Sequence, residues 1–443
     1  MSGQTSIRSS RLGRMAAFAG TGARVGINYL KHYGQRSIGT APDENDLHER
    51  NAEVVYKTFS ELKGGPLKLA QMLSIDQNLL PAAYAGQFAK AQYSAPPLSY
   101  PLVARTFRRE MGKGPLEIFD SFSETAAHGA SIGQVHKATK DGHTYAVKVQ
   151  YPGVAESLRS DLRIVKPVAL QIIGFRERDV EGYFREVESR LLEETDYTLE
   201  LQRSMELSQA SAHLEGVSFP RYFPEFSCRR ILTMDWVDAI TLDRFAKSAA
   251  SREERDRIGQ ALWDFYDFQI HTLHLFHADP HPGNFLVRDG GLVVLDFGCT
   301  KKIEQVFYRR HFRFLDERLL EDRAALEEAL VDLEIVLPDD PEKFRSRLRE
   351  FCASSIAILA RPFRDGHFDF SDPAFMRSIY DLGEQNRRDE SLRSLRGQRG
   401  SPDSIYVNRA YFGLYSLLSA IGARVKTRLP EWLREPEGSG INS

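Results

Sequence analysis

The apolar residues change their spacing along the chain, and this change predicts which segments are helices and which are strands. From Leu47 to about Ala91 they recur at helical spacing, and Gly64-Gly65-Pro66 divides this region, with Pro66 suited to the first turn of a second helix. Between Phe119 and Tyr151 the spacing becomes that of strands. There, Asp141-Gly142 predicts a tight hairpin turn just before a buried strand over His143–Tyr151.

The second part of the chain begins with helices and strands in alternation. Between Val180 and Leu191 apolar residues recur three and four apart, which predicts one buried helix face. Ser251 and Glu254 have the spacing of a capping box, which marks a helix start. The elements predicted after Tyr151 are a helix over Asp179–Ser211, a strand over Arg229–Val237, a helix from Ser251 to about Leu275, short strands at Asn284–Val287 and Leu292–Leu295 around the turn Asp289-Gly290-Gly291, and only helices after Thr300. The predicted fold class is α+β, with a small mixed lobe followed by a helical lobe.

The composition is that of an ordinary globular protein. The 443 residues are 42% hydrophobic and 27% charged, which excludes a disordered or fibrous chain and allows two or three domains. A net charge of −2 provides no global basic surface, so no nucleic-acid partner is expected. Cys228, Cys299 and Cys352 are far apart and form no CxxC pair, which argues against a disulfide scaffold or a cysteine-built zinc site. The sequence contains no stretch of 18 uncharged apolar residues, so no membrane-spanning helix is predicted.

The first 42 residues differ in composition from the rest of the chain. They contain Arg8, Arg11, Arg14, Arg24, Lys31 and Arg36, and the first acidic residue is Asp43. An organellar transit peptide has this composition, and so does a basic segment lying on an anionic membrane surface. A flexible solvated tail is the third interpretation, and the sequence leaves all three open.

The densest group of chemically capable residues is His277-Ala-Asp279-Pro-His281-Pro-Gly-Asn284, followed by Asp296-Phe297-Gly298. Phosphoryl transfer needs a carboxylate that receives or orients the attacking hydroxyl's proton, and oxygen ligands for magnesium. Asp279 and Asn284 are five apart on one loop, so one can face the nucleophile while the other faces the metal. Asp296 ends a short apolar strand, which would hold a second ligand oxygen beside them. The spacing and order match the kinase pattern HRDxxxxN…DFG.

A lysine and a small-residue turn strengthen this interpretation. Lys148 is centred on an apolar strand in Tyr145-Ala-Val-Lys-Val, similar to the V-A-I-K strand of kinases, and a buried ammonium needs a carboxylate partner. The long helix offers Glu194, our preferred partner, with Glu193 and Glu200 as alternatives. Ahead of Lys148, the turn His128-Gly-Ala-Ser131-Ile-Gly133 has side chains small enough for backbone N–H groups to approach phosphate oxygens.

Two other patterns have alternative explanations. His271, His274, His277 and His281 have spacings that admit a transition-metal site, but His277 is better interpreted as an architectural residue of the catalytic loop. The apolar run Tyr411–Val425 is compatible with a membrane contact, although a packed helix of the helical lobe is favoured.

Taken together, these motifs resemble the UbiB/AarF/ADCK family of atypical, protein-kinase-like proteins. The matching segments are Lys68-Leu-Ala-Gln71-Met-Leu-Ser, Ala130-Ser131-Ile-Gly133-Gln134-Val-His136, Ala146-Val-Lys148-Val-Gln-Tyr-Pro, Glu194-Thr-Asp196-Tyr, Phe276-His-Ala-Asp279-Pro-His-Pro-Gly-Asn284 and Leu295-Asp296-Phe-Gly. The resemblance runs from about Arg11 to the C-terminus. It implies a two-lobed protein-kinase-like fold with an N-terminal helical extension over the active site.

The resemblance also implies roles for individual residues. In the family, the lysine and glutamine of a KxGQ helix, here Lys68 and Gln71, fill the space where a protein kinase admits its peptide. The ExD motif corresponds to Glu194 and Asp196, with Glu194 pairing with the strand lysine. The nucleotide site is assigned to Gly129, Ala130, Ser131, Gly133, Lys148, Asp235 and Val237. Ala70 replaces the family's glycine, and His128-Gly129 makes the usually alanine-rich loop more like a kinase glycine-rich loop.

From the motifs and the family resemblance, we expect a chain of four segments that forms an ATP-dependent, kinase-like enzyme. The segments are a basic N-terminal region (1–45), a helical extension with the KxGQ-like motif (46–115), a kinase-like N-lobe with inserted helices (116–238) and a helical C-lobe (239–443). Asp279 is the expected catalytic carboxylate, Asn284 and Asp296 the magnesium ligands, and the Lys148–Glu194 pair the anchor for ATP or ADP.

The family resemblance further implies a role in isoprenoid-quinone or related lipid metabolism. The expected partners are such lipids or the proteins that make them, with peripheral membrane contact. The expected location is the cytoplasm or the inner membrane surface, or a mitochondrion or plastid if the N-terminal region is a transit peptide. A nucleotide-binding pseudokinase scaffold and an aminoglycoside- or choline-type phosphotransferase are the alternative functions.

Overall fold

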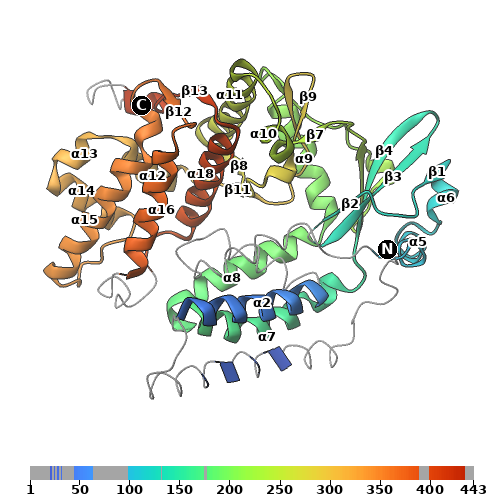
Figure 1. Ribbon diagram of the computed structural model, residues 1–443, viewed down its shortest axis with the longest axis horizontal. Helices are drawn as coiled ribbons and strands as arrows, with labels where there is room; N and C mark the ends of the chain where they lie inside the picture. Colours follow the sequence, from blue (N-terminus) through green and yellow to red (C-terminus); the bar gives the residue numbers. More distant parts are fainter. Residues whose placement is uncertain are drawn as a thin grey trace. The chain divides into compact units, whose positions relative to one another are not determined.

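The computed structural model describes residues 44–62, 98–130, 132–173, 177–388 and 399–434, together with residues 20, 21, 24, 27, 28 and 31 (Figure 1). The chain divides into two compact units. The first comprises Met1–Met205 and Pro220–Val237, and the second Glu206–Phe219 and Asp238–Ser443. The segment boundaries at 45/46, 115/116 and 238/239 stay predictions.

The first unit is built on an antiparallel five-stranded sheet. Its strands are β1 (Ser121–Phe122), β2 (His128–Gly129), β3 (Gly133–Lys140), β4 (His143–Gln150) and β6 (Ile231–Asp235), in the order β1-β3-β4-β6 with β2 paired to β3. The β3–β4 turn has positive φ at both central residues, 52° at Asp141 and 77° at Gly142, as a two-residue hairpin turn requires. The predicted Asp-Gly hairpin and the strand after it are confirmed.

The strand register separates the two faces of this sheet. Residues that pair directly across antiparallel strands share a face, so His136 and Val147 lie on one face and Val135 and Lys148 on the other. The His136 face packs into an aromatic core with Phe107 of α5 (Tyr100–Met111). The opposite face is therefore the one that presents Lys148.

The helices of the first unit are α2 (Glu44–Leu62), α5, α6 (Pro115–Ile118), α7 (Val154–Ile173), α8 (Glu177–Glu194) and α9 (Tyr197–Ala210), whose last turn belongs to the second unit. The single helix predicted over Asp179–Ser211 is wrong, because α8 and α9 are separate. Asp196 caps α9: its Oδ1 accepts hydrogen bonds from the Thr198 N–H at 3.1 Å and the Thr198 hydroxyl at 2.5 Å. A capping aspartate inside a continuous apolar pattern marks the break.

The second unit is mostly helical and contains a four-stranded sheet built on the β9–β10 hairpin. The four-stranded sheet has the order β5-β10-β9-β7, formed by β5 (Val217–Ser218), β10 (Gly291–Val294), β9 (Phe285–Arg288) and β7 (Ile240–Thr241). Residues 289 and 290 form the β9–β10 turn with φ of 52° and 74°, so the predicted hairpin is confirmed. Beside it, β8 (Leu275–His277) pairs with β11 (Thr300–Lys302).

Helix α11 (Arg252–Phe268) begins with the predicted capping box. The Ser251 N–H donates to Glu254 Oε2 at 2.8 Å, and the Glu254 N–H donates to Ser251 Oγ at 3.2 Å. The helix continues into a π-helical turn over Gln269–Leu273, and His274 ends it with a φ of 51°. This turn directs the Gln269 side chain toward β8, which leads into the predicted catalytic loop.

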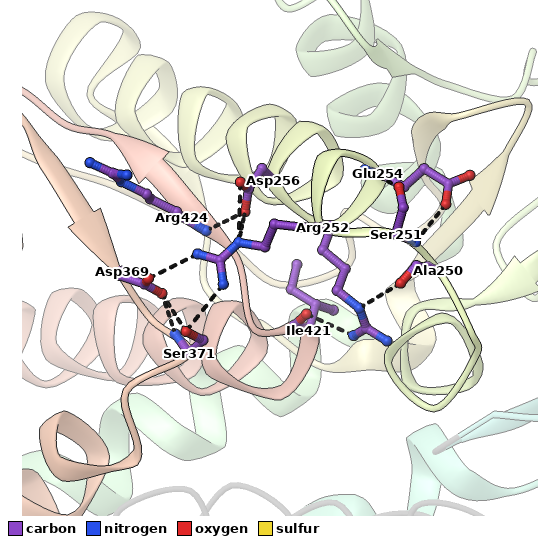
Figure 2. Close-up of polar contacts among 10 residues, drawn as sticks. Ala250, Ser251, Arg252, Glu254, Asp256, Asp369, Ser371, Ile421 and Arg424 are labelled. Carbon is purple, nitrogen blue, oxygen red and sulfur yellow. Dashed lines mark hydrogen bonds and ion pairs between the residues drawn. The ribbon is translucent and has the colours of Figure 1, made fainter.

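The prediction of helices alone after Thr300 is wrong in three places. Besides β11, the strands β12 (His367–Asp369) and β13 (Arg424–Lys426) pair with each other. Figure 2 shows how side chains tie this pair to α11. Arg252 contacts both Asp256 (Nε–Oδ1, 3.1 Å) and Asp369 (Nη2–Oδ2, 2.9 Å), and the Arg424 N–H donates to Asp256 Oδ1 at 2.6 Å. Partners more than 100 residues apart leave no signal in the local pattern.

The remaining helices of the second unit complete its core. They are α10 (Leu242–Ala246), α12 (Gln305–Phe312), α13 (Arg318–Glu321), α14 (Arg323–Asp332), α15 (Glu342–Leu359), α16 (Pro373–Arg388), α18 (Pro402–Ile421) and α19 (Glu431–Arg434). Helix α18 is buried along much of its length, including Leu414 and Leu418, so the interpretation of Tyr411–Val425 as a packed helix is confirmed as far as Ile421, whereas Val425 belongs to β13. No helix within the described ranges is long and apolar enough to cross a membrane.

Candidate functional site

In the first unit, Lys148 lies in a largely buried, charge-compensated position. It stands near the middle of β4, and its side chain is 11% exposed. Its Nζ lies 2.7 Å from Glu200 Oε1 and 5.0 Å from the ring centroid of Tyr197. Both partners come from the first turn of α9, three residues apart, so the helix cap at Asp196 positions the whole arrangement. A buried ammonium paired in this way is held in one place.

The ion-pair partner of Lys148 in the structure differs from the one that we preferred. We expected Glu194, with Glu193 and Glu200 as alternatives, and the structure forms the ion pair with Glu200. Glu194 is the last residue of α8, whereas Glu200 is on α9, so the helix break places the two candidates on different elements. Glu193 instead contacts Arg190 at 3.0 Å and Arg203 at 2.6 Å.

The small-residue turn ahead of Lys148 contains one glycine with a strict packing requirement. A Cβ at Gly133 would lie 2.5 Å from the Val149 carbonyl oxygen and 2.8 Å from the Tyr197 hydroxyl. At Gly129 it would meet nothing within 4 Å. The Ala130 N–H donates to the Gly133 carbonyl at 2.9 Å and closes the turn. Gly133 therefore permits the close approach of β3, β4 and α9.

At the end of β6, Asp235 makes contacts within the first unit. His143 Nε2 lies 2.7 Å from Asp235 Oδ1, and the Arg221 N–H donates to Asp235 Oδ2 at 2.9 Å. The Trp236 N–H donates to the Thr144 carbonyl at 3.0 Å. These bonds fix the backbone leading to Val237, while nucleotide contacts by Asp235 and Val237 stay predictions.

In the second unit, the predicted catalytic loop follows β8, and hydrogen bonds or ion pairs hold Asp279 at both its carbonyl and its carboxylate. The Asp279 carbonyl accepts hydrogen bonds from the His281 N–H at 2.7 Å and from Asn284 Nδ2 at 3.0 Å. Its carboxylate Oδ1 lies 2.7 Å from Arg409 Nη2 of α18. Arg409 is a site residue that sequence reasoning missed, because it follows Asp279 by 130 residues and belongs to no recognised motif.

Behind this loop is a buried polar layer. The His277 N–H donates to Gln269 Oε1 at 2.7 Å, and the His277 Nδ1 lies 3.3 Å from the Tyr266 hydroxyl. Burial lowers the pKa of His277 despite the neighbouring carboxylates of Asp279 and Asp296, and burial raises the pKa of Tyr266. His277 is therefore a neutral structural residue at physiological pH, in agreement with its predicted architectural role.

Asn284 and Asp296 are brought together by the β9–β10 hairpin. Val294 pairs with Phe285, and the Leu295 N–H donates to the Asn284 carbonyl at 3.0 Å, so Asp296 follows directly on this pairing. Because Asn284 Nδ2 donates to the Asp279 carbonyl, its Oδ1 is the end of the amide that can ligate a cation. The Gly298 N–H fixes Asp296 Oδ1 at 2.7 Å. A carboxylate and an amide oxygen held in this way fit magnesium, which prefers oxygen ligands.

The four histidines have separate roles. His271 lies between two hydroxyls, with its Nδ1 3.0 Å from Tyr308 and its Nε2 2.8 Å from Tyr411, and burial lowers its pKa to about 3. His281 Nδ1 accepts a hydrogen bond from the Gly283 N–H. Across the described part of the chain, no group of three or more histidine, cysteine or acidic residues could hold a metal ion.

Three predicted site residues, Lys68, Gln71 and Ser131, lie outside the described residues, as does Ala70. The structure brings Lys148, Gly133 and Tyr197 together in the first unit, and Asp279, Asn284 and Asp296 together in the second.

With this geometry in view, comparison with known proteins identifies the family. Residues 90–330, more than half of the chain, match the model of the ABC1 atypical kinase-like domain. The chain belongs to the ABC1 atypical kinase-like family. The resemblance found in the sequence motifs is thereby confirmed.

Relatives with kinase names support this assignment. The chain is 26% identical to the atypical kinase COQ8, mitochondrial, of Saccharomyces cerevisiae, over 95% of this chain and 84% of the relative. It is 26% identical to the probable serine/threonine-protein kinase abkA of Dictyostelium discoideum, over 81% of this chain and 66% of the relative. A chloroplastic Arabidopsis thaliana protein, ACTIVITY OF BC1 COMPLEX KINASE 8, is 32% identical over 60% of this chain and 36% of the relative. The matches to abkA and to the Arabidopsis protein thus leave a third or more of those proteins uncovered.

A solved structure shows the fold. The Rv3197–erythromycin complex from Mycobacterium tuberculosis has a TM-score of 0.60 with this ABC1-family chain and 24% identity, covering 88% of this chain and 98% of the other. The predicted α+β, two-lobed kinase-like fold class is confirmed.

Proposed function

We propose that this protein binds Mg–ATP and acts as an atypical kinase or ATPase in isoprenoid-quinone or related lipid metabolism. Family membership supports the kinase-like chemistry. The lipid assignment follows from the family resemblance of the sequence motifs. Asp279 is the proposed catalytic carboxylate, and Asn284 and Asp296 are the proposed magnesium ligands.

The observation that supports this proposal most strongly is the shared geometry of the catalytic loop and the β9–β10 hairpin. Asn284 contacts the Asp279 backbone through its side chain and Leu295 through its carbonyl. Asn284 thus connects the proposed catalytic carboxylate, Asp279, with the strand end that leads to the second proposed magnesium ligand, Asp296. Magnesium, when bound, would neutralise the charge that develops on the phosphate oxygens.

The ion pair of the first unit supplies the proposed phosphate anchor. Glu200 holds the Lys148 ammonium at 2.7 Å, so the lysine does not need to become ordered when a nucleotide arrives. In this proposal Lys148 binds the α- and β-phosphates, and Glu200 takes the orienting role first assigned to Glu194. Gly133 keeps the neighbouring turn close to β4.

The proposed substrate side involves a membrane lipid. Residues 1–42 are basic, so we propose peripheral contact with an anionic membrane surface, which would bring the enzyme to an isoprenoid substrate. The named mitochondrial and chloroplastic relatives make an organelle the proposed location.

A phosphate-release assay tests the proposal. Mg–ATP turnover is measured with and without vesicles of phosphatidylcholine and phosphatidylglycerol that contain an isoprenoid quinone. We expect vesicle-stimulated turnover that Asp279→Asn abolishes. Asp289→Asn is the matched control, because Asp289 is 92% exposed in the β9–β10 turn and asparagine tolerates its positive φ.

Nucleotide binding without turnover on any vesicle would overturn the enzymatic proposal and favour a pseudokinase scaffold. Phosphorylation of an aminoglycoside or choline, with no response to vesicles, would favour a small-molecule phosphotransferase instead.

A further inference from the structure

Helix α18 contacts the catalytic loop at two successive positions on one face. Arg409 Nη2 lies 2.7 Å from Asp279 Oδ1, and one turn later Gly413 packs on Pro280. The side chains of Arg409 and Asp279 are 9% and 19% exposed. The ion pair is therefore part of the interior of the second unit, unlike a solvated surface pair.

The position of α18 relative to the loop is fixed on both sides of Arg409. A Cβ at Gly413 would lie 2.0 Å from Pro280 Cγ, so the helix backbone approaches the loop as closely as glycine allows. Six residues before Arg409, Asp403 Oδ1 lies 2.8 Å from Lys301 Nζ of β11. These contacts prevent α18 from sliding along the loop, so the guanidinium meets the carboxylate in one defined place.

Arg409 adds a constraint on the side chain of Asp279 to those on its backbone. The Asp279 carbonyl is already held by His281 and Asn284. Those bonds fix the backbone and leave the side-chain torsions to be set by what the carboxylate contacts. A charge-assisted bond to a planar, persistently charged guanidinium sets them and also offsets the cost of burying the carboxylate.

We propose that Arg409 is a positioning residue for the reaction, which aims the Asp279 carboxylate at the nucleophile. This inference rests on the proposed function, because it assumes that Asp279 acts on a nucleophile. Arg409 acts through Asp279 and has no assigned contact with nucleotide or metal. Its loss should therefore lower turnover while nucleotide and magnesium binding persist.

The test compares Arg409→Ala and Arg409→Lys with wild type in the full-length protein, measuring kcat, KM for Mg–ATP and nucleotide affinity. We expect kcat to fall by about 10- to 100-fold in Arg409→Ala, as for a misaligned catalytic group, with KM and affinity within about twofold. Arg409→Lys should retain intermediate activity, because lysine keeps the positive charge but lacks the planar guanidinium with its several fixed donors. Arg377→Ala, which removes an exposed arginine of α16, is the matched control.

Chemical rescue separates positioning from a merely structural role. Millimolar guanidinium should restore part of the kcat of Arg409→Ala, because it can occupy the space vacated beside Asp279, whereas urea at the same concentration should not. In the Asp279→Asn background, Arg409→Ala should have no further effect. If Arg409→Ala is too unstable to assay, Arg409→Lys and Arg409→Gln test the same point, since only the charged residue should keep activity.

Two results would overturn the inference while the proposed function stands. One is an unchanged kcat in Arg409→Ala although Asp279→Asn is inactive. The other is a loss of kcat that follows the folded fraction and does not respond to guanidinium. Absence of any turnover that depends on Asp279 would remove the proposed function, and the inference with it.

Discussion

Neutralising Glu200 tests the central contact of the first unit. At 2.7 Å, an ion pair in a medium of effective dielectric constant 20 gains about 6 kcal/mol of Coulomb energy. Much of this gain offsets the cost of desolvating two side chains that are 11% and 4% exposed. Glu200→Gln leaves the buried Lys148 ammonium facing a neutral amide, so we expect the free energy of unfolding to fall by about 3 to 5 kcal/mol.

Urea unfolding followed by circular dichroism measures this loss, and the transition of the first unit is the one expected to shift. Glu188→Gln on α8 is the matched control: its partner Arg159 is 3.8 Å away, both side chains are exposed, and the expected effect is about 0.5 kcal/mol or less. A double-mutant cycle with Lys148→Met should show a coupling of at least about 1 kcal/mol. A loss below 1 kcal/mol together with negligible coupling would refute the assignment of Glu200.

Three further predictions concern packing, pH and helix-end contacts. Gly133→Ala should destabilise the protein by roughly 1 to 3 kcal/mol in urea unfolding, whereas Gly129→Ala should change stability by less than about 0.5 kcal/mol; equal effects would contradict the packing argument. Burial raises the pKa of Asp267 to about 6, so its ionised form is disfavoured in the folded state, and stability is lost as pH rises from about 4 through 6. Asp267→Asn should therefore stabilise the protein at pH 8 by up to about 3 kcal/mol but not at pH 4, and a stabilisation independent of pH would count against this cause. Arg255 donates to the carbonyls of Ala246, Ser248, Ala250 and Ile421, so Arg255→Ala should lower the free energy of unfolding by roughly 2 to 4 kcal/mol and Arg255→Lys by less. Similar losses in both variants would show that the several donors of the guanidinium are unimportant.

Local chemistry made several elements predictable. The two hairpin turns follow from Asp-Gly sequences whose positive φ angles few other residues adopt. The start of α11 follows from Ser251 and Glu254, which bond to each other across one turn. Within the catalytic motif, Asp279, Asn284 and Asp296 are close in sequence, so loop spacing and one hairpin are enough to bring them together.

Longer-range features were not predictable from one sequence. The partner of Lys148 depended on a helix break at Asp196, and the apolar period of the region hid that break because both helices bury the same type of residue. The β12–β13 pair and the Arg409–Asp279 contact join segments separated by 55 residues or more, for which a local pattern contains no information. Asp196 itself was the available signal, since an aspartate followed by a helix-forming run is a strong N-cap.

The most direct test of the whole account is the magnesium dependence of nucleotide binding, measured by isothermal titration calorimetry. With Mg²⁺ present, ATP should bind wild type and Asp289→Asn with equal affinity, and Asp296→Asn at least about tenfold more weakly, a difference of about 1.4 kcal/mol. When Mg²⁺ is chelated, the three proteins should bind ATP with similar, weaker affinities. If Asp296→Asn bound Mg–ATP as tightly as wild type, then the carboxylate after β10 would not be a magnesium ligand, and the proposed phosphoryl-transfer site would be wrong.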